Sequence, residues 1–376
     1  MKTVNGVYAS AKIFTDNVEA YALAQIQMLC DHAASEGSRI RVMPDVHPGK
    51  VGTIGLTMTV GEMALPNVTG IDIGCGITIT KIKQKKIEYQ KLDKVIRENV
   101  PSGAALRAKV HRFAEETGLE RLRCCEHVNL DKAEASLGTL GGGNHFIEID
   151  RDEEGGLYAA VHSGSRHLGK EVTEYYLAQG QKALKESGVK VPYELTYLTG
   201  ELLEDYLYDQ QIVQEFAEIN RQAILDEIRK GMKWKMEESI SCVHNYIEIP
   251  EEDSGAEPML RKGAISAKDG ERVVIPINMR DGMILGTGKG NRDWNESAPH
   301  GSGRILKRSE VKSRYTMAQF KTEMKGIYCT CIGKETLDEA PFAYRRLEEI
   351  AGNIAETVEI DKVIRPVYNY KDGSRR

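Results

Sequence analysis

Glycine residues cluster around histidines in this chain, and this feature constrains its fold most strongly. The 376 residues include 36 glycines and nine histidines. The glycines follow no regular period, which excludes a collagen-like rod. Because glycine lets the backbone pass close to another group, we interpret the clusters as places where the chain approaches a ligand or another segment. The clusters therefore favour a globular protein in which the backbone passes close to a ligand or to another chain segment.

Composition and charge narrow the class of protein further. Hydrophobic residues make up 41% of the chain, enough for a sizeable core, and the formal net charge is -5. A protein that coats duplex nucleic acid should be basic, so this class is disfavoured, although a local basic groove stays open. The seven cysteines are odd in number and irregularly spaced, which predicts reduced thiols in a cytoplasmic protein. The chain begins without an apolar signal core and has no run of about 20 apolar residues, so no membrane partner is expected.

Local patterns predict a mixed arrangement of helices and strands. No linker or internal repeat divides the chain, so we expect one integrated domain over residues 1–376. Apolar periodicity predicts helices over residues 15–37, 91–99, 106–117, 202–240 with a break at Gly231, and 343–357. Alternating and β-branched runs predict strands over residues 56–60, 77–82, 146–149, 158–161 and 272–277. Because the two types mix without a strict β-α-β alternation, the predicted fold class is α+β.

The histidines divide into two groups by their surroundings. His32, His111 and His127 lie in helix-like or charged segments, where an ordinary solvated or hydrogen-bonded histidine is the better interpretation. The other six lie in segments of unusual composition, rich in glycine, proline or small polar residues. These are His47, His145, His162, His167, His244 and His300.

A glycine-rich turn at residues 70–76 adds a carboxylate and a thiol to this set. Asp72 and Cys75 are three residues apart, and a tight turn would point both at one ion. Taken alone, Cys75 is better interpreted as a buried free thiol. Taken with the imidazoles, it belongs to a mixed hard and soft ligand set that suits Mn, Zn, Fe or Co better than Mg or Ca. The whole set therefore favours a metal site.

Other patterns carry less information. Glycine-rich stretches at residues 163–166, 286–291 and 301–304 can cradle phosphates, but each alone is more often a plain turn. None is a Walker A loop, because Gly290 follows Lys289. Cys329 and Cys331 have no second pair at zinc-site spacing, so we interpret them as two thiols on an alternating strand. The lysines of residues 81–86 favour a solvated strand end over an RNA contact.

Several of these segments together resemble one family. They are PDVHPG at 44–49, DIGCG at 72–76, GGGNHFIE at 141–148, VHSGSRHLG at 161–169, HN at 244–245, RKGA at 261–264, KGN at 289–291, SAPHGSGR at 297–304 and DEAP at 338–341. With these segments in this order, the sequence resembles the RtcB family of GTP-dependent RNA ligases, which join RNA 3'-phosphate ends to 5'-hydroxyl ends. The resemblance covers the chain from about residue 40 to its end.

The resemblance implies a compact mixed α/β fold with a central metal-binding cleft that holds two Mn²⁺ ions. It implies that Cys75 bridges the two ions and that the family's other metal ligands match Asp72, His145, His162 and His244. It also implies that His300 is the catalytic nucleophile, which becomes linked to GMP from the cofactor GTP. Arg166 and Arg304 would lie near RNA phosphates.

The family's guanylate-binding positions match a longer set of residues. They are Asn144, His145, Phe146, Ile147, Glu148, His244, Asn245, Pro276, Ile277, Asn278, Met279, Met283, His300, Gly301, Ser302, Gly303 and Lys371. A carboxylate at Glu148 suits guanine, whose amino and ring N–H groups can donate to it. The stretch before His300 departs from the family pattern, because Ile277 and Asn278 replace small residues and Met283 replaces a serine that touches the nucleotide.

These observations favour one activity and leave two alternatives. The favoured reading is a GTP- and manganese-dependent ligase that joins RNA 3'-phosphate or 2',3'-cyclic phosphate ends to 5'-hydroxyl ends, in RNA repair or tRNA splicing. The divergent stretch at residues 277–283 keeps open a two-metal phosphoesterase that has lost ligation. A non-catalytic RNA-binding homologue is the third reading. The natural RNA, a helper protein and the oligomeric state are not determined by the sequence.

Overall fold

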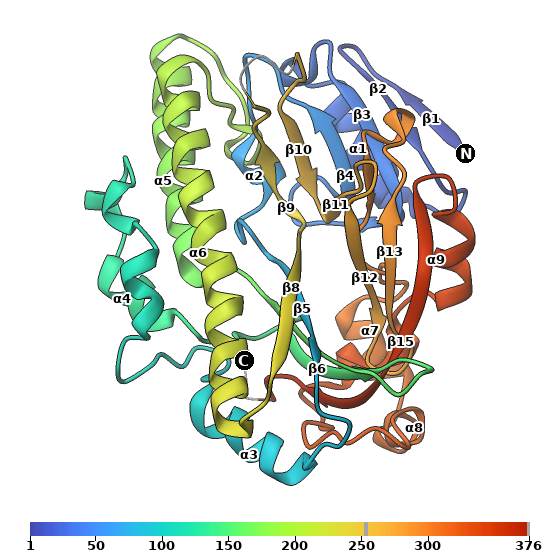
Figure 1. Ribbon diagram of the computed structural model, residues 1–376. Coiled ribbons are helices and arrows are strands. Elements are labelled where there is room, and N and C mark those ends of the chain that lie inside the picture. Colours follow the sequence, from blue (N-terminus) through green and yellow to red (C-terminus); the bar gives the residue numbers. More distant parts are fainter. Residues whose placement is uncertain (252–254, 374–376) are drawn as a thin grey trace.

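Two large β-sheets and the helices around them make up the α+β fold shown in Figure 1, a computed structural model. The structure describes residues 1–251 and 255–373. The first sheet has six strands in the order β1-β2-β3-β4-β10-β9, and only its β2–β3 pair is parallel. Its strands are β1 (Lys2–Asn5), β2 (Ser10–Ile13), β3 (Arg39–Pro48), β4 (Thr53–Thr59), β9 (Asn245–Glu248) and β10 (Met259–Lys262).

The second sheet has seven antiparallel strands in the order β12-β13-β15-β6-β7-β5-β8. They are β5 (Gly76–Ile82), β6 (Phe146–Arg151), β7 (Leu157–Ser163), β8 (Met236–Val243), β12 (Arg272–Asn278), β13 (Gly282–Gly288) and β15 (Val358–Tyr370). A short antiparallel pair, β11 (Ala264–Ser266) with β14 (Ser297–Pro299), completes the strands of the described residues. The chain passes from β8 directly to β9, so the two large sheets meet at His244.

Helices bury both sheets. The helix bounds are α1 (Ala20–Cys30), α2 (Pro66–Thr69), α3 (Tyr89–Asn99), α4 (Leu130–Ser136), α5 (Arg166–Glu186), α6 (Gly200–Met232), α7 (Arg308–Arg314), α8 (Met317–Glu323) and α9 (Leu347–Asn353). The long helices α5 and α6 run side by side along one flank (Figure 1). On the seven-stranded sheet, Leu92 of α3 and Ile228 of α6 join Ile147 and Val161 in one apolar cluster. This burial removes apolar surface from water and holds the strands that end at the site.

All five predicted strands correspond to strands of the structure, namely β4, β5, β6, β7 and β12, and the α+β class is confirmed with them. The helix predicted over residues 106–117 is wrong, because the chain forms only a 3₁₀ turn at Arg112–Glu116 there. Buried His111 accepts a hydrogen bond from the Phe113 N–H and Arg107 N–H donates to the Ala135 carbonyl, so tertiary contacts replace helical ones. Helix 202–240 is wrong in its last part, because α6 ends at Met232.

Three further expectations differ from the structure. The helix predicted over residues 15–37 is shorter, because only Ala20–Cys30 is α-helical. The helix predicted over residues 343–357 is shorter, because only Leu347–Asn353 is helical. Cys329 and Cys331 do not alternate on a strand: their segment is a turn, and their Sγ atoms lie 3.1 Å apart. The seven cysteines are free thiols in the structure, as predicted.

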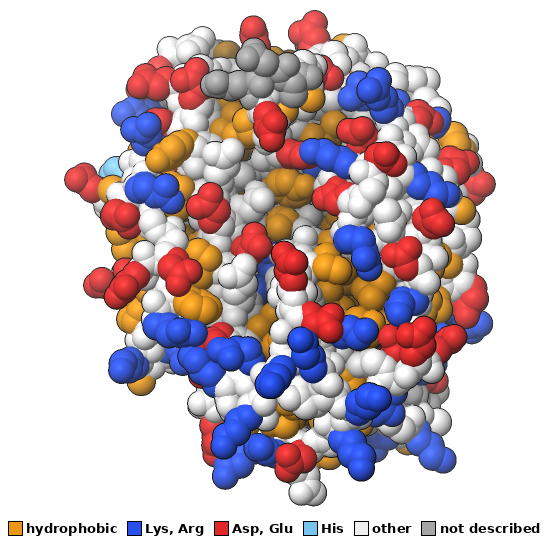
Figure 2. Space-filling view, viewed as in Figure 1, with side chains coloured by type: hydrophobic (Ala, Val, Ile, Leu, Met, Phe, Trp, Pro, Cys, Tyr) orange, Lys and Arg blue, Asp and Glu red, His pale blue; other side chains and the backbone are white. Residues whose placement is uncertain are grey.

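The surface carries charges of both signs. Acidic and basic side chains are interspersed over the face in Figure 2, with Lys and Arg more frequent toward the lower end, where α3 and α8 lie in Figure 1. This distribution agrees with a net charge of -5 and with a locally basic region. Within the described part of the chain, no helix combines the length and the hydropathy needed to cross a bilayer.

Candidate functional site

Neighbouring strands of the seven-stranded sheet bring four of the predicted metal ligands together. Cys75 directly precedes β5, His145 directly precedes β6, and His162 lies near the end of β7. His244 follows β8. Because β5 pairs with both β7 and β8, with Gly76 opposite Ser163 and Val243, these strand ends meet at one edge. Asp72 reaches the same place from the turn before β5.

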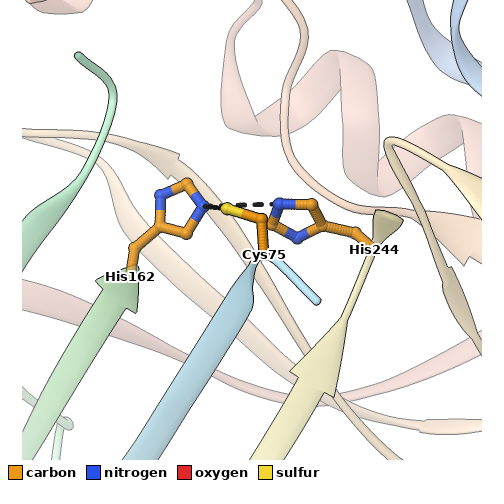
Figure 3. A group of neighbouring side chains, drawn as sticks. All are labelled: Cys75, His162 and His244. Atoms are coloured by element: carbon orange, nitrogen blue, oxygen red, sulfur yellow. Dashed lines mark hydrogen bonds between the residues drawn. The ribbon is translucent and has the colours of Figure 1, made fainter. Parts of the chain in front are cut away.

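The ligand atoms of these five side chains form two groups that share Cys75. Its Sγ lies 3.3 Å from His162 Nε2 and 3.5 Å from His145 Nε2. His162 Nε2 is 3.4 Å from His244 Nε2, and His145 Nε2 is 3.2 Å from Asp72 Oδ2. Figure 3 shows the group of Cys75, His162 and His244, whose side chains point toward one another from three chain segments. Each group alone has the residue types and spacing to hold one metal ion.

Hydrogen bonds orient the ligand atoms. His145 Nδ1–H donates to the Leu140 carbonyl at 2.9 Å and His162 Nδ1–H to the Asn144 carbonyl at 3.2 Å, which leaves both Nε2 lone pairs for the centre. Asp72 Oδ1 accepts from the Ser165 N–H at 3.1 Å, which leaves Oδ2 for the centre. The close approach needs a glycine at residue 164, because a Cβ on Gly164 would lie 2.2 Å from Asp72 Oδ1.

Burial prepares these groups for a cation. Burial lowers the pKa of His162 and of His244 well below the usual range, so both imidazoles are neutral. Burial also acts to raise the pKa of Asp72, but His145 and Arg166 outweigh it and lower that pKa to about 2. Burial and the Asp72 charge raise the pKa of the Cys75 thiol, so its ionisation requires added positive charge at the site.

His300 lies beside this cluster, and its imidazole contacts the carboxylate of Asp45. Its Nδ1 is 2.7 Å from Oδ2 of Asp45, which is fully buried on β3. The His300 ring centroid is 4.7 Å from that of His244. With Nδ1–H donated to Asp45, the lone pair of Nε2 is free. The glycine at residue 303 has a φ of +72°, and a Cβ there would lie 2.2 Å from the Asp45 carbonyl oxygen.

A cavity of about 250 Å³ opens next to His300. Many of the residues that were predicted to bind a nucleotide line it. They are Asn144, Phe146, Glu148, Pro276, Ile277, Asn278, Met279, His300, Gly301, Ser302, Gly303 and Lys371. His162 also lines the cavity, so the metal-ligand cluster and the cavity share a wall.

The cavity does not include all of the predicted nucleotide residues. The side chain of Ile147 is buried in the apolar cluster on the other face of β6. Met283 is 0% exposed and packs among the apolar residues beneath the β12–β13 hairpin, so its side chain does not reach the cavity; Gly282 lines it instead. His145, His244 and Asn245 lie at the metal-ligand cluster, where Asn245 Nδ2 donates to the Asp72 carbonyl at 3.2 Å.

Cations gather around Glu339 at the far wall of the cavity. Lys371 Nζ is 3.1 Å from Glu339 Oε2, and Arg304 is 3.3 Å from its other oxygen; Arg308 also contacts Glu339. Burial acts to raise the pKa of Glu339, but the three cations outweigh it and lower that pKa to about 2. Arg166 lies on the opposite side, at the metal-ligand cluster, where its guanidinium approaches His145 at 3.4 Å.

Several residues of the site were missed by the sequence reasoning. Asp45 stands in the PDVHPG segment and Glu339 in the DEAP segment, so the motifs held a signal for both. Arg308, Tyr344 and Asn369 also line the cavity, and no local pattern marks them. His167, one of the six histidines in segments of unusual composition, lies on α5 near Glu171 and outside the cavity lining.

Comparison with known proteins agrees with this arrangement. Residues 29–372 match the family model described as tRNA-splicing ligase RtcB. The chain belongs to the RtcB family. It is 30% identical to the RNA-splicing ligase RtcB of Escherichia coli K12, with 87% of this chain and 88% of that protein covered. A second RtcB relative, the tRNA-splicing ligase RtcB of Aeropyrum pernix, is 29% identical over 86% of this chain and 85% of its own length. The matched residues 29–372 include every residue of the site and all strands of the two large sheets except β1 and β2.

Proposed function

We propose that this protein is an RNA ligase that joins 3'-phosphate or 2',3'-cyclic phosphate ends to 5'-hydroxyl ends, with GTP and two Mn²⁺ ions as cofactors. RtcB membership and the names of the relatives support the reaction class. One structural observation carries the mechanism. A histidine, held by a buried carboxylate, faces a cavity that shares a wall with a cluster of five metal-ligating side chains.

The donor set fits two divalent ions. Cys75 belongs to both groups of ligands, and a thiolate has lone pairs for two ions. Asp72, His145 and Cys75 would hold one ion, and His162, His244 and Cys75 would hold the other. When bound, such ions neutralise phosphate charge and favour an in-line displacement at phosphorus.

His300 is the proposed nucleophile. Its Nε2 attacks the α-phosphorus of GTP, a P–N bond forms, and the bond to the β-phosphate oxygen breaks to release pyrophosphate. The Asp45 carboxylate accepts the Nδ1–H throughout and stabilises the positive charge that develops on the ring. An oxygen of the RNA 3'-phosphate then attacks the same phosphorus, and the His300 imidazole leaves.

The last step joins the two RNA ends. The 5'-hydroxyl attacks the activated 3'-phosphate, the new phosphodiester forms, and GMP leaves. A cyclic phosphate end must first be opened by water to a 3'-phosphate. Arg304 and Arg308 on the cavity wall, and Arg166 at the ligand cluster, supply positive charge for RNA and nucleotide phosphates.

Glu148 is the proposed base-reading residue. It lies in the cavity wall, and Asn369 Nδ2 donates a hydrogen bond to its Oε2. Lys371 Nζ lies 5.2 Å from the centre of the Phe146 ring in the same wall. A carboxylate here accepts hydrogen bonds from the amino and ring N–H groups of guanine, whereas adenine presents a ring acceptor to it.

The test is ligation of a 3'-phosphate RNA to a 5'-hydroxyl RNA with purified protein, GTP and Mn²⁺. Sealing that requires all three components supports the proposal. Release of phosphate from the 3' end without sealing would instead support the two-metal phosphoesterase. RNA binding with neither reaction would support the non-catalytic homologue.

A further inference from the structure

A second carboxyl group, that of Asp150, lies next to Glu148 on strand β6. Glu148 and Asp150 are two residues apart on β6, so their side chains leave the same face of the sheet. Asp150 is 0% exposed, and neither of its carboxyl oxygens receives a hydrogen bond from an N–H or O–H donor of the described residues. A buried carboxylate in this state would carry a large desolvation cost.

Among the described residues, no cation contacts Asp150. Its cross-strand neighbours are Tyr158 on β7 and Pro366 on β15. Proline has no N–H, and the Tyr158 hydroxyl donates to Asp152 at 2.9 Å. The carboxyl groups of Glu148 and Asp150 shift the pKa of each other, and the Lys371 ammonium shifts that of Glu148 alone. Within the part of the chain that the structure describes, the one polar partner left for Asp150 is therefore Glu148.

Two neighbouring carboxyl groups in such a place are satisfied by one proton between them. Burial raises the pKa of Asp150 well above its usual range and that of Glu148 to about 7. Glu148 has the Asn369 amide and the Lys371 charge to stabilise its ionised form, whereas Asp150 has neither. The proton therefore resides on Asp150, whose O–H donates to the Glu148 carboxylate.

We propose that Asp150 is a positioning residue for recognition of the nucleotide base: its carboxyl stays protonated at neutral pH, and its O–H donates a hydrogen bond to Glu148. This donation fixes Glu148 as a charged acceptor at the cavity wall. The ligand that fits is a purine with two adjacent N–H donors, as on the Watson–Crick edge of guanine. The inference rests on the proposed function, because Glu148 must face the base.

The experiment measures GTP and ATP binding by calorimetry from about pH 6 to about pH 9 in the wild type, Asp150→Asn, Asp150→Ala and Asp152→Asn. In the wild type, the preference for GTP rises as Glu148 ionises near pH 7. It falls again at higher pH, because loss of the Asp150 proton adds a second negative charge and frees Glu148. Asp150→Asn keeps an N–H donor that does not titrate, so its preference for GTP does not fall at high pH. Asp150→Ala lacks the donor and binds GTP about tenfold more weakly at neutral pH. Asp152→Asn is the matched control, since Asp152 accepts from Gly156 N–H and Tyr158 and behaves as the wild type.

An infrared spectrum gives a readout that does not need the nucleotide. Above about pH 7, where Glu148 is ionised, the wild type and Asp152→Asn show the C=O band of a protonated carboxyl, and Asp150→Asn lacks it. The inference is overturned if that band persists in Asp150→Asn, or if Asp150→Ala keeps the GTP affinity and preference of the wild type. Failure of the proposed function looks different, because the wild type itself would then bind neither purine nucleotide or both equally.

Discussion

His300 and Asp45 are 255 residues apart in the chain, and the fold brings their side chains to 2.7 Å. The Asp45 carboxylate holds the imidazole in the tautomer whose Nε2 carries a lone pair. Asp45→Asn keeps the shape of the side chain but offers an N–H where an acceptor is needed. We expect protein guanylylation to slow by about 100-fold or more, because a general base or nucleophile in the wrong tautomer loses most of its reactivity.

The measurement is the rate of covalent labelling with radiolabelled GTP. Asp16→Asn is a suitable control, because Asp16 is exposed and contacts the chain's N-terminal amine. A rate in Asp45→Asn within about twofold of the wild type would show that the carboxylate does not act through His300.

Cys75 is the residue common to both groups of metal ligands. Cys75→Ser replaces a thiol that a metal ion can ionise by a hydroxyl that stays protonated and bridges poorly. We expect the variant to lose most of its bound Mn²⁺ and all ligation. Cys125→Ser is the control, since that thiol is outside the cluster. Metal analysis by mass spectrometry decides, and an unchanged metal content in Cys75→Ser would exclude the bridging role.

The β12–β13 hairpin differs most from its expected role. Met283 is paired with Pro276 and Ile364 and is buried in an apolar cluster, although its place in the sequence predicts a nucleotide contact. Met283→Ser therefore leaves a cavity and buries a hydroxyl. We expect the free energy of unfolding to fall by about 2–5 kcal/mol, with no gain in GTP affinity.

Urea unfolding measures the stability change in Met283→Ser. Ile360→Ser on the neighbouring strand is the control, because Ile360 is 37% exposed and its replacement should cost only about 0.5 kcal/mol. Tighter GTP binding in Met283→Ser, with unchanged stability, would place this residue in the nucleotide site after all.

At the level of elements, local sequence patterns correctly predicted strands and a helix that local residue preferences determine. The strands Gly76–Ile82 and Arg272–Asn278 follow from β-branched residues, and helix Tyr89–Asn99 follows from its apolar spacing. Strand β15 was missed, because it is defined by pairing with β13 and β6, and its β6 partners are more than 200 residues earlier in the chain. Residue type marked Asp72, Cys75 and six histidines as candidates, and the family resemblance selected the proposed metal ligands among them. Asp45 and Glu339 act through contacts that only the tertiary fold creates.

The whole molecule places the site between its two large sheets. Asp45 belongs to the six-stranded sheet, His162 to the seven-stranded sheet, and His244 to the junction between them. We therefore propose that residues 1–376 unfold as one cooperative domain and that Mn²⁺ stabilises it. A free metal concentration of 100 times Kd should add about 2.7 kcal/mol to the free energy of unfolding.

Calorimetric unfolding with and without Mn²⁺ tests this expectation. We predict a single transition whose midpoint rises with Mn²⁺, and no such rise in Cys75→Ser. Two separate transitions, of which only one responds to Mn²⁺, would contradict the single domain.

Whether His300 carries the guanylate is decided by intact-protein mass spectrometry after incubation with GTP and Mn²⁺. We expect one added GMP on the wild type and on His127→Ala, whose exposed imidazole is a matched control. We expect none on His300→Ala, although this variant should still seal RNA that already carries a 3'-guanylate cap. A GMP adduct that persists in His300→Ala, or a wild type that ligates RNA without ever forming an adduct, would exclude His300 as the carrier.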